Sequence, residues 1–206
     1  MGESESKQHW QKAHTRRAGE ALSWYQQRPS VSLAMIEATG LGQAAAIIDV
    51  GGGASTLVDH LIAAGYSDIT VLDIAASAID VARQRLAAKA ENVAWLSADA
   101  TEWAPARRYD IWHDRAVFHF LTEVAQRRAY VERLEAALAE GGQAIFATFA
   151  LDGPKRCSGL PVQRYDGASL ARELGAAFTL VESRRETHET PGGMAQKFHY
   201  SRFARR

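Results

Sequence analysis

Apolar positions along the chain repeat with two different periods. Short, nearly continuous apolar runs are typical of buried strands, whereas longer stretches with an apolar residue every three to four positions are typical of amphipathic helices. The first pattern predicts strands at 44–50, 69–73, 93–97, 109–115, 143–149, 178–186 and 194–203. The second predicts helices at 30–37, 56–62, 77–89, 125–139 and 168–174. Strands that alternate with helices form a parallel sheet with helices on both faces, so we expect an α/β fold that ends in an antiparallel strand pair.

The segments outside this alternation predict how the sheet is covered. Residues 6–28 carry Trp10, Trp24 and Tyr25 among polar residues, which suggests one or two helices lying over an apolar surface. Ser30 is expected to cap the helix that follows, and residues 151–165 to form a long polar loop. We expect one domain over 1–206, with a helical lid at 1–40 and the core at 41–206. Plain core packing of the tryptophans is the alternative.

Composition narrows the classes of partner. The chain has 206 residues, of which 47% are hydrophobic, with 24 basic and 24 acidic residues. A neutral chain of this length can bury a full core and suggests neither nucleic acid nor a membrane as a partner. Its N-terminus is polar and its apolar runs are short, so we expect a cytoplasmic location. The sequence does not decide between a monomer and a homodimer. With Cys157 as the single cysteine we assign no disulfide and no metal.

The candidate chemistry lies where the first strands end. Gly51 to Gly53 follow the first predicted strand and precede a helix, so the backbone there can approach a ligand closely. The first three strands end in Asp49, Asp73 and Asp99. The carboxyl ends of parallel strands share one edge of the sheet, where α/β proteins bind ligands. Each aspartate alone could be a turn or helix cap, but three at one edge favour a binding site.

The residue types at this edge indicate which nucleotide binds. Asp73 is placed to accept hydrogen bonds from both hydroxyls of a ribose. Asp49, at the mouth of the glycine turn, would repel the pyrophosphate of a dinucleotide but would suit a ligand with an ammonium and a sulfonium. Thr56 stands where a dinucleotide fingerprint needs a small residue. We therefore infer S-adenosylmethionine as the cofactor.

Four motifs in this order resemble those of the class I S-adenosylmethionine-dependent methyltransferases. They are DVGGGAS at 49–55, VLDI at 71–74, ADA at 98–100 and YDIWHDR at 109–115. The resemblance is strong over about residues 40–150. It implies a seven-stranded Rossmann-like sheet with strand order 3-2-1-4-5-7-6, the last strand antiparallel and helices on both faces.

The same resemblance implies roles for individual residues. Gly51 and Gly53 would pass beneath the methionine part of the cofactor, and Asp49 would hold that loop and the amino group. Asp73 would hold the ribose, and Asp99 the adenine amino group. The other implied cofactor-binding residues are Trp24, Ser55, Ile74, Ala100 and Asp114.

A narrower likeness concerns the acceptor. His9-Trp10, Ser23-Trp24-Tyr25 and Asp114-Arg115 resemble segments of the small methyltransferases that modify lysines of translation elongation factors. Arg115 stands where those enzymes have Lys, and His113 precedes the pair, so their substrate does not carry over. The likeness implies that Trp24 closes over the cofactor.

Methyl transfer needs alignment and a dry site, and a protonated acceptor must also lose a proton. At the end of the fourth strand the catalytic candidates are Asp114, His113 and His119, although His119 could equally be a buried core histidine. We expect a small-molecule acceptor beside an aromatic cluster of Trp112, Phe118 and Phe120. Lys155 and Arg156 either bind an acidic group on it or lie in a solvated loop. A protein lysine is the alternative acceptor, and a non-catalytic nucleotide-binding module is a third hypothesis.

Overall fold

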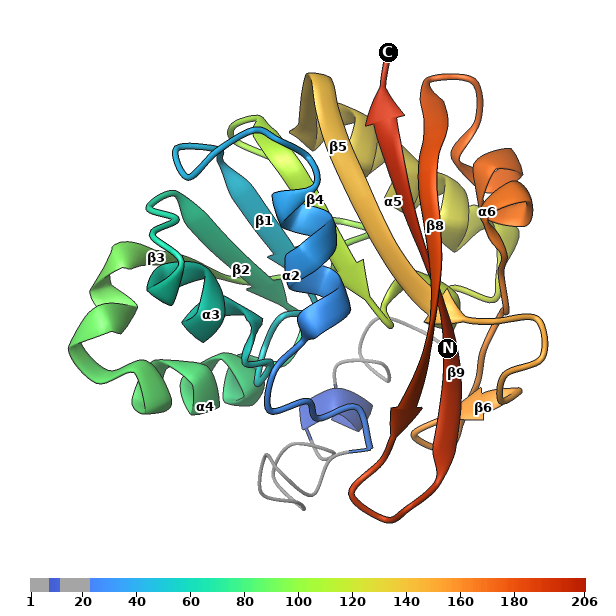
Figure 1. Cartoon of the computed structure of the whole chain (residues 1–206), viewed down its shortest axis with the longest axis horizontal. Helices are drawn as coiled ribbons and strands as arrows, with labels where there is room; N and C mark the ends of the chain where they lie inside the picture. The colour runs from blue at the N-terminus through green and yellow to red at the C-terminus, as the bar shows by residue number, and fades with distance from the viewer. Residues whose placement is uncertain (1–7, 12–22) are drawn as a thin grey trace.

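The computed structural model describes residues 8–11 and 23–206 (Figure 1). Residues 8–11 are helical. The later elements are α2 (Ser30–Glu37), β1 (Ile47–Val50), α3 (Leu57–Ala63), β2 (Ile69–Asp73), α4 (Ala76–Leu86), η2 (Ala87–Asn92), β3 (Val93–Ser97), β4 (Tyr109–Arg115), η3 (Phe118–Phe120), α5 (Val124–Ala137), β5 (Leu138–Phe149), β6 (Arg156–Cys157), β7 (Leu160–Pro161), α6 (Gly167–Leu174), β8 (Phe178–Glu189) and β9 (Ala195–Arg205).

Seven strands form one sheet in the order β3-β2-β1-β4-β5-β9-β8. The strands from β1 to β5 pair in parallel, and β9 runs antiparallel to both β5 and β8. The predicted seven-stranded Rossmann-like sheet and its strand order are confirmed, because β8 and β9 occupy the places of the expected sixth and seventh strands. Among the described residues no helix is long and apolar enough to cross a membrane.

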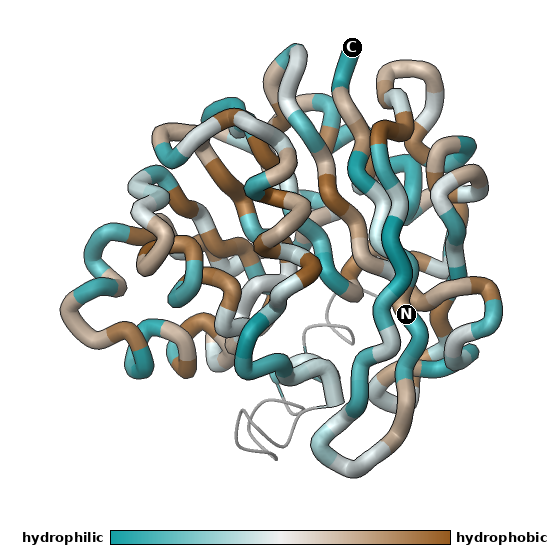
Figure 2. The backbone as a smooth tube through the Cα atoms, in the orientation of Figure 1, coloured by the Kyte–Doolittle hydropathy of each residue, from teal (hydrophilic) through white to brown (hydrophobic). Residues whose placement is uncertain are grey.

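Helices bury both faces of the sheet, which explains why its central strands are apolar on both sides. On one face Met35 of α2 and Leu57 and Leu61 of α3 pack with Ile47 and Ile111 of the sheet. On the other face the apolar side chains of α5 and α6 pack against the alternate residues of the same strands. Figure 1 shows α2 in front of the sheet and α5 behind it, and Figure 2 shows hydrophobic central strands beside a more polar β8–β9 hairpin.

Several predicted boundaries differ from the structure. The strand predicted at 143–149 begins at Leu138 instead, because Leu138 already pairs with Tyr109 of β4. The helix predicted at 77–89 gives way at Ala87, whose φ of +50° cannot continue an α-helix, to the 3₁₀ turn η2. Ser30 does not cap α2, which begins after Pro29 without a side-chain cap. The predicted loop at 151–165 contains the β6–β7 hairpin.

Candidate active site

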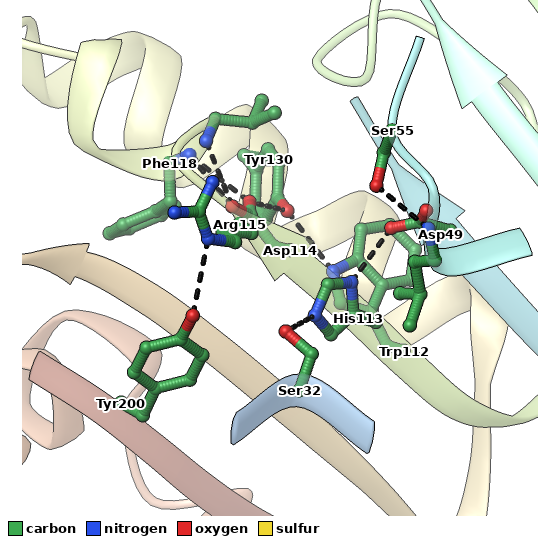
Figure 3. Close-up of polar contacts among 12 residues, drawn as sticks. Ser32, Asp49, Ser55, Trp112, His113, Asp114, Arg115, Phe118, Tyr130 and Tyr200 are labelled. Atoms are coloured by element: carbon green, nitrogen blue, oxygen red, sulfur yellow. Dashed lines mark hydrogen bonds and ion pairs between the residues drawn. The ribbon is translucent and has the colours of Figure 1, made fainter. Parts of the chain in front are cut away.

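A pocket lies at the carboxyl ends of β1 to β4. Its walls come from the loops after these strands, from Trp10 and from residues 24–29. The residues 23–29, called the Trp24 segment below, run across this end of the sheet (Figure 1). Figure 3 shows the polar contacts behind the pocket wall.

The glycine turn after β1 is shaped by three close approaches. Gly51 has a φ of +70°, and a Cβ there would clash with the side chain of Val117. A Cβ on Gly52 would clash with the carboxylate of Asp49. Gly51 and Gly52 line the pocket, whereas Gly53 lies behind them, where a Cβ would clash with Asp73. The three glycines therefore bring the backbone close to both carboxylates.

Asp49 is fixed from behind by a histidine. Its Oδ1 lies 2.7 Å from His113 Nδ1, and His113 Nε2 lies 2.9 Å from Ser32 Oγ (Figure 3). The Asp49 and His113 side chains are buried, with relative exposures of 3% each. Asp49 Oδ2 is also buried and has no hydrogen-bond partner among residues 8–11 and 23–206. A buried carboxylate oxygen that receives no hydrogen bond from the protein can accept one from an N–H or O–H group of a ligand.

Asp73 and Asp99 line the pocket beyond the glycine turn. Asp73 Oδ1 accepts a hydrogen bond from the Ala75 amide at 2.8 Å. Burial raises the pKa of Asp73 to about 7, and the charge of Asp49 adds to the rise. Asp99 Oδ1 accepts from the amide and the hydroxyl of Thr101, at 2.8 and 2.7 Å. Each of these carboxylates uses one oxygen to hold its own loop.

Asp114 does not reach the pocket. It is fully buried, and it accepts hydrogen bonds from the amides of Val117 and Phe118, at 2.9 and 3.0 Å, and from the Tyr130 hydroxyl (Figure 3). Burial raises its pKa to about 6, and its hydrogen bonds oppose the rise. Asp114 therefore fixes the loop after β4, in which Ala116 has a φ of +68°. This geometry argues against the predicted contact of Asp114 with acceptor or cofactor.

The two candidate histidines are not placed as bases. Both ring nitrogens of His113 lie within hydrogen-bond distance of Asp49 or Ser32, although its ring contributes to the wall. His119 is fully buried outside the pocket lining, and its Nδ1 accepts from the Phe149 amide at 3.3 Å. Burial lowers the pKa of His119 to about 3, and the nearby charge of Arg115 contributes. His119 is therefore neutral and matches the alternative of a core histidine.

Hydrogen bonds to several of its backbone carbonyls hold the Trp24 segment in place. Arg115 Nη1 donates to the Trp24 carbonyl at 3.0 Å, and Thr56 Oγ1 donates to the Gln26 carbonyl at 2.8 Å. His188 Nε2 lies 2.9 Å from the Ser23 carbonyl. Trp24 itself lines the pocket and meets Trp10 edge to face, with ring centroids 5.9 Å apart. The remainder of the predicted lid, at 1–7 and 12–22, lies outside the described residues.

The other predicted residues divide between wall and core. Ser55, Ile74 and Ala100 line the pocket. Of the expected aromatic cluster only Phe120 does so, whereas Trp112 and Phe118 lie in the core outside the lining. Lys155 and Arg156 are exposed and lie outside the pocket lining.

Sequence reasoning missed several residues of this wall, among them Gly52, Val117, Tyr130 and Cys157. Gly52 carried a signal, since three consecutive glycines suggest more than two close approaches. Tyr130 carried none, because its place in a helix gives no hint of its partner Asp114.

Comparison with known proteins places this architecture in context. Residues 47–142 match the methyltransferase domain family. Nodulation protein S of Rhizobium tropici is 28% identical over 107 residues, which are 52% of this chain and 44% of that protein. The chain thus spans less than half the length of this relative.

Solved structures resemble the chain over most of its length. The N-methyltransferase NodS of Bradyrhizobium japonicum, in complex with S-adenosylhomocysteine, has a TM-score of 0.68 at 18% identity and covers 87% of this chain and 89% of its own. The 1,6-didemethyltoxoflavin-N1-methyltransferase of Burkholderia thailandensis, with 1,6-didemethyltoxoflavin and S-adenosylhomocysteine bound, has a TM-score of 0.69 at 22% identity and covers 98% and 84%. At these identities the likeness establishes the fold.

Proposed function

We propose that this chain, whose residues 47–142 carry a methyltransferase domain on the class I fold, transfers a methyl group from S-adenosylmethionine to a small-molecule acceptor. The observation that carries the proposal is the convergence of three carboxylates, from the ends of β1, β2 and β3, on one pocket beside the glycine turn. The whole chain from 1 to 206 would form one methyltransferase domain.

The pocket chemistry fits this cofactor. Asp49 Oδ2 is buried without a donor, as expected of an oxygen that receives the ammonium of the methionine part. Asp73 would take the ribose hydroxyls, and Asp99 the adenine amino group between Ile74 and Ala100. All three groups are acceptors, and the corresponding groups of the cofactor are donors. A pyrophosphate at the glycine turn would instead face the Asp49 carboxylate.

The cofactor supplies an electrophilic methyl group on a positively charged sulfur, so the protein's part is alignment and exclusion of water. The glycine turn and Val117 would fix one side of the reacting centre. Trp24 and Trp10 would cover it, because both line the pocket. His113 acts here as a positioning residue for Asp49, and Asp114 and Tyr130 as positioning residues for the loop that carries Val117.

His113 is the one histidine among the described residues of the pocket lining, and it is not placed to accept a proton. His113 is engaged at both nitrogens, and the Tyr130 hydroxyl donates to Asp114. The pocket therefore suits an acceptor whose nucleophilic atom already has a lone pair available at neutral pH. A lysine side chain, which is protonated at that pH, needs a base that these residues do not offer.

Two further observations support a small molecule as the methyl acceptor. The walls opposite the carboxylates are largely apolar and aromatic, with Trp10, Trp24 and Phe120. A similarly folded enzyme, the 1,6-didemethyltoxoflavin-N1-methyltransferase, has 1,6-didemethyltoxoflavin bound in its structure. Transfer to a protein lysine and a non-catalytic binding role are the alternatives.

The test is calorimetric titration of the full chain with S-adenosylmethionine, S-adenosylhomocysteine and NAD. We expect both sulfur nucleotides to bind and NAD not to bind. NAD binding without the sulfur nucleotides would replace the proposal by an oxidoreductase. A tritiated methyl donor, offered with small-molecule pools and separately with lysate proteins, would then separate the two acceptor classes. Tight binding with label transferred to neither would favour the non-catalytic role.

A further inference from the structure

The sheet order separates the charges around the pocket. Asp49, Asp73 and Asp99 follow β1, β2 and β3, which form one half of the sheet. Arg115 ends β4 on the other side, next to β5, and pairs there with Ala147. Arg115 is the one basic side chain among the described residues of the pocket lining, apart from His113. The pocket is therefore acidic on the cofactor side and cationic on the opposite side.

The Arg115 guanidinium is held rigidly but incompletely. Its Nε donates to the Tyr200 hydroxyl at 3.1 Å (Figure 3). Its Nη1 donates to the Trp24 carbonyl at 3.0 Å, and its Cζ lies 4.6 Å from the centroid of the Phe198 ring. Its Nη2 is buried and has no hydrogen-bond partner in the part of the chain that the structure describes. Among the described residues no carboxylate lies within ion-pair distance of Arg115, since Glu186 accepts hydrogen bonds from the Tyr200 hydroxyl and from Gln26 Nε2 instead, both at 2.9 Å.

An unpaired donor on a permanent charge is costly to bury. A ligand that accepts a hydrogen bond from Nη2 of Arg115 would remove this cost. Beside Arg115 the wall is apolar and aromatic, and Trp10 and Phe120 meet there edge to face with ring centroids 4.9 Å apart. Burial raises the pKa of the Cys157 thiol in this wall, and the nearby charge of Arg115 opposes the rise. This combination suits a flat apolar body with an anionic group at one end.

We propose that the methyl acceptor is an aromatic carboxylic acid whose carboxylate is bound by Nη2 of Arg115. The inference rests on the proposed function and adds the substrate class. A carboxylate fits better than a phosphate, because Arg115 has one uncommitted nitrogen and a dianion would need several more donors. Lys155 and Arg156 cannot supply them, since both lie outside the pocket lining.

A pair of probes with the same shape tests the contribution of the carboxylate charge to binding. The full chain, saturated with S-adenosylhomocysteine, is titrated with 2-naphthoate and with 2-naphthamide, which share shape but differ in charge. We expect the acid to bind at least about ten-fold more tightly than the amide, as for a buried charged hydrogen bond. Equal affinities, or a preference for the amide, with S-adenosylhomocysteine bound would overturn the inference and leave the proposed function standing. Failure of S-adenosylhomocysteine itself to bind would overturn the proposed function and this inference with it.

Variants assign the preference to Arg115. Arg115→Gln is expected to reduce the ratio of acid to amide affinity to within about two-fold. Both probes are titrated at saturating S-adenosylhomocysteine, so a change in nucleotide affinity caused by the lost contact with the Trp24 carbonyl does not alter this ratio. Arg115→Lys keeps the charge and should retain part of the preference, which also decides the matter if Arg115→Gln does not fold. Arg156→Gln removes a neighbouring exposed charge beside Cys157 and should leave the ratio unchanged. Full preference in Arg115→Gln, or its loss in Arg156→Gln, would show that Arg115 does not bind the carboxylate.

Discussion

Asp73 combines a binding role with a titration in the neutral range. Burial raises its pKa to about 7 in the free protein, and ribose hydroxyls donate to the ionised form, so cofactor binding should lower this pKa again. The form that binds is therefore the one that predominates above pH 7. We expect affinity for S-adenosylhomocysteine to rise with pH up to about pH 8 and then level off, with a slope approaching about ten-fold per unit below pH 7.

Calorimetry in two buffers of different ionisation enthalpy checks this by measuring the proton released on binding at pH 6. Asp73→Asn should abolish both the proton release and the pH dependence. Asp73→Ala should weaken binding by about 1–3 kcal/mol, since the ribose hydroxyls lose their acceptor. Affinity independent of pH in the unaltered protein would contradict the ribose assignment.

Asp114 contributes to the stability of the fold rather than to ligand binding. Asp114→Ala would leave two amides and the Tyr130 hydroxyl buried without an acceptor, so we expect the free energy of unfolding to fall by about 2–4 kcal/mol. Urea denaturation measures this. Asp80→Ala, at an exposed position on α4, is the control and should change stability by less than about 0.5 kcal/mol.

At this scale the sequence identified the pocket residues whose backbone position decides their role. The aspartates after β1 to β3 follow from strand periodicity, because a residue that closes a parallel strand must lie at the binding edge. Strand periodicity could not predict the roles of Asp114, His113 and His119. Their roles depend on which neighbours they face, such as Ser32 and Tyr130, and these partners come from distant parts of the chain.

Among the elements, the glycine turn is the one whose geometry is most sharply constrained. A Cβ on Gly52 would clash with the Asp49 carboxylate, which cannot turn aside without leaving His113. We expect Gly52→Ala to lower the affinity for S-adenosylhomocysteine by about ten-fold or more, measured by calorimetry, because Asp49 would lose its position. Gly192→Ala is the matched control, since the nearest atom to its Cβ would be Thr190 Oγ1 at 3.8 Å. Similar affinities for the two variants would show that Asp49 does not hold the cofactor.

Elements were predictable where burial alone determines them. The predicted strands 69–73, 93–97 and 109–115 coincide with β2, β3 and β4, each an apolar run within the sheet. Hydrophobic periodicity did not predict features that depend on strand pairing or on local backbone conformation. The start of β5 depends on the pairing of Leu138 with Tyr109, and the β6–β7 hairpin is two residue pairs long, too short for any periodic signal.

In the whole molecule, the β8–β9 hairpin and the Trp24 segment meet beside the pocket (Figure 1). These strands have 12 and 11 residues against four in β1, so the hairpin reaches past the edge where the parallel strands end. There His188 Nε2 lies 2.9 Å from the Ser23 carbonyl, and Glu186 accepts from Gln26 Nε2 at 2.9 Å. Burial lowers the pKa of His188, so it is a neutral donor at physiological pH. The last two strands thus hold a segment from the other end of the chain over the pocket.

If this contact keeps the pocket closed, weakening it should speed the loss of bound nucleotide. We expect His188→Ala to raise the dissociation rate of S-adenosylhomocysteine about three- to ten-fold, the worth of one hydrogen bond, when followed by stopped-flow tryptophan fluorescence. His188→Gln can still donate to the Ser23 carbonyl and should restore most of the slow rate. Glu189→Ala, at the neighbouring exposed position, should have no effect. An unchanged rate in folded His188→Ala would mean that the Trp24 segment is held by its contacts with Arg115 and Thr56 instead.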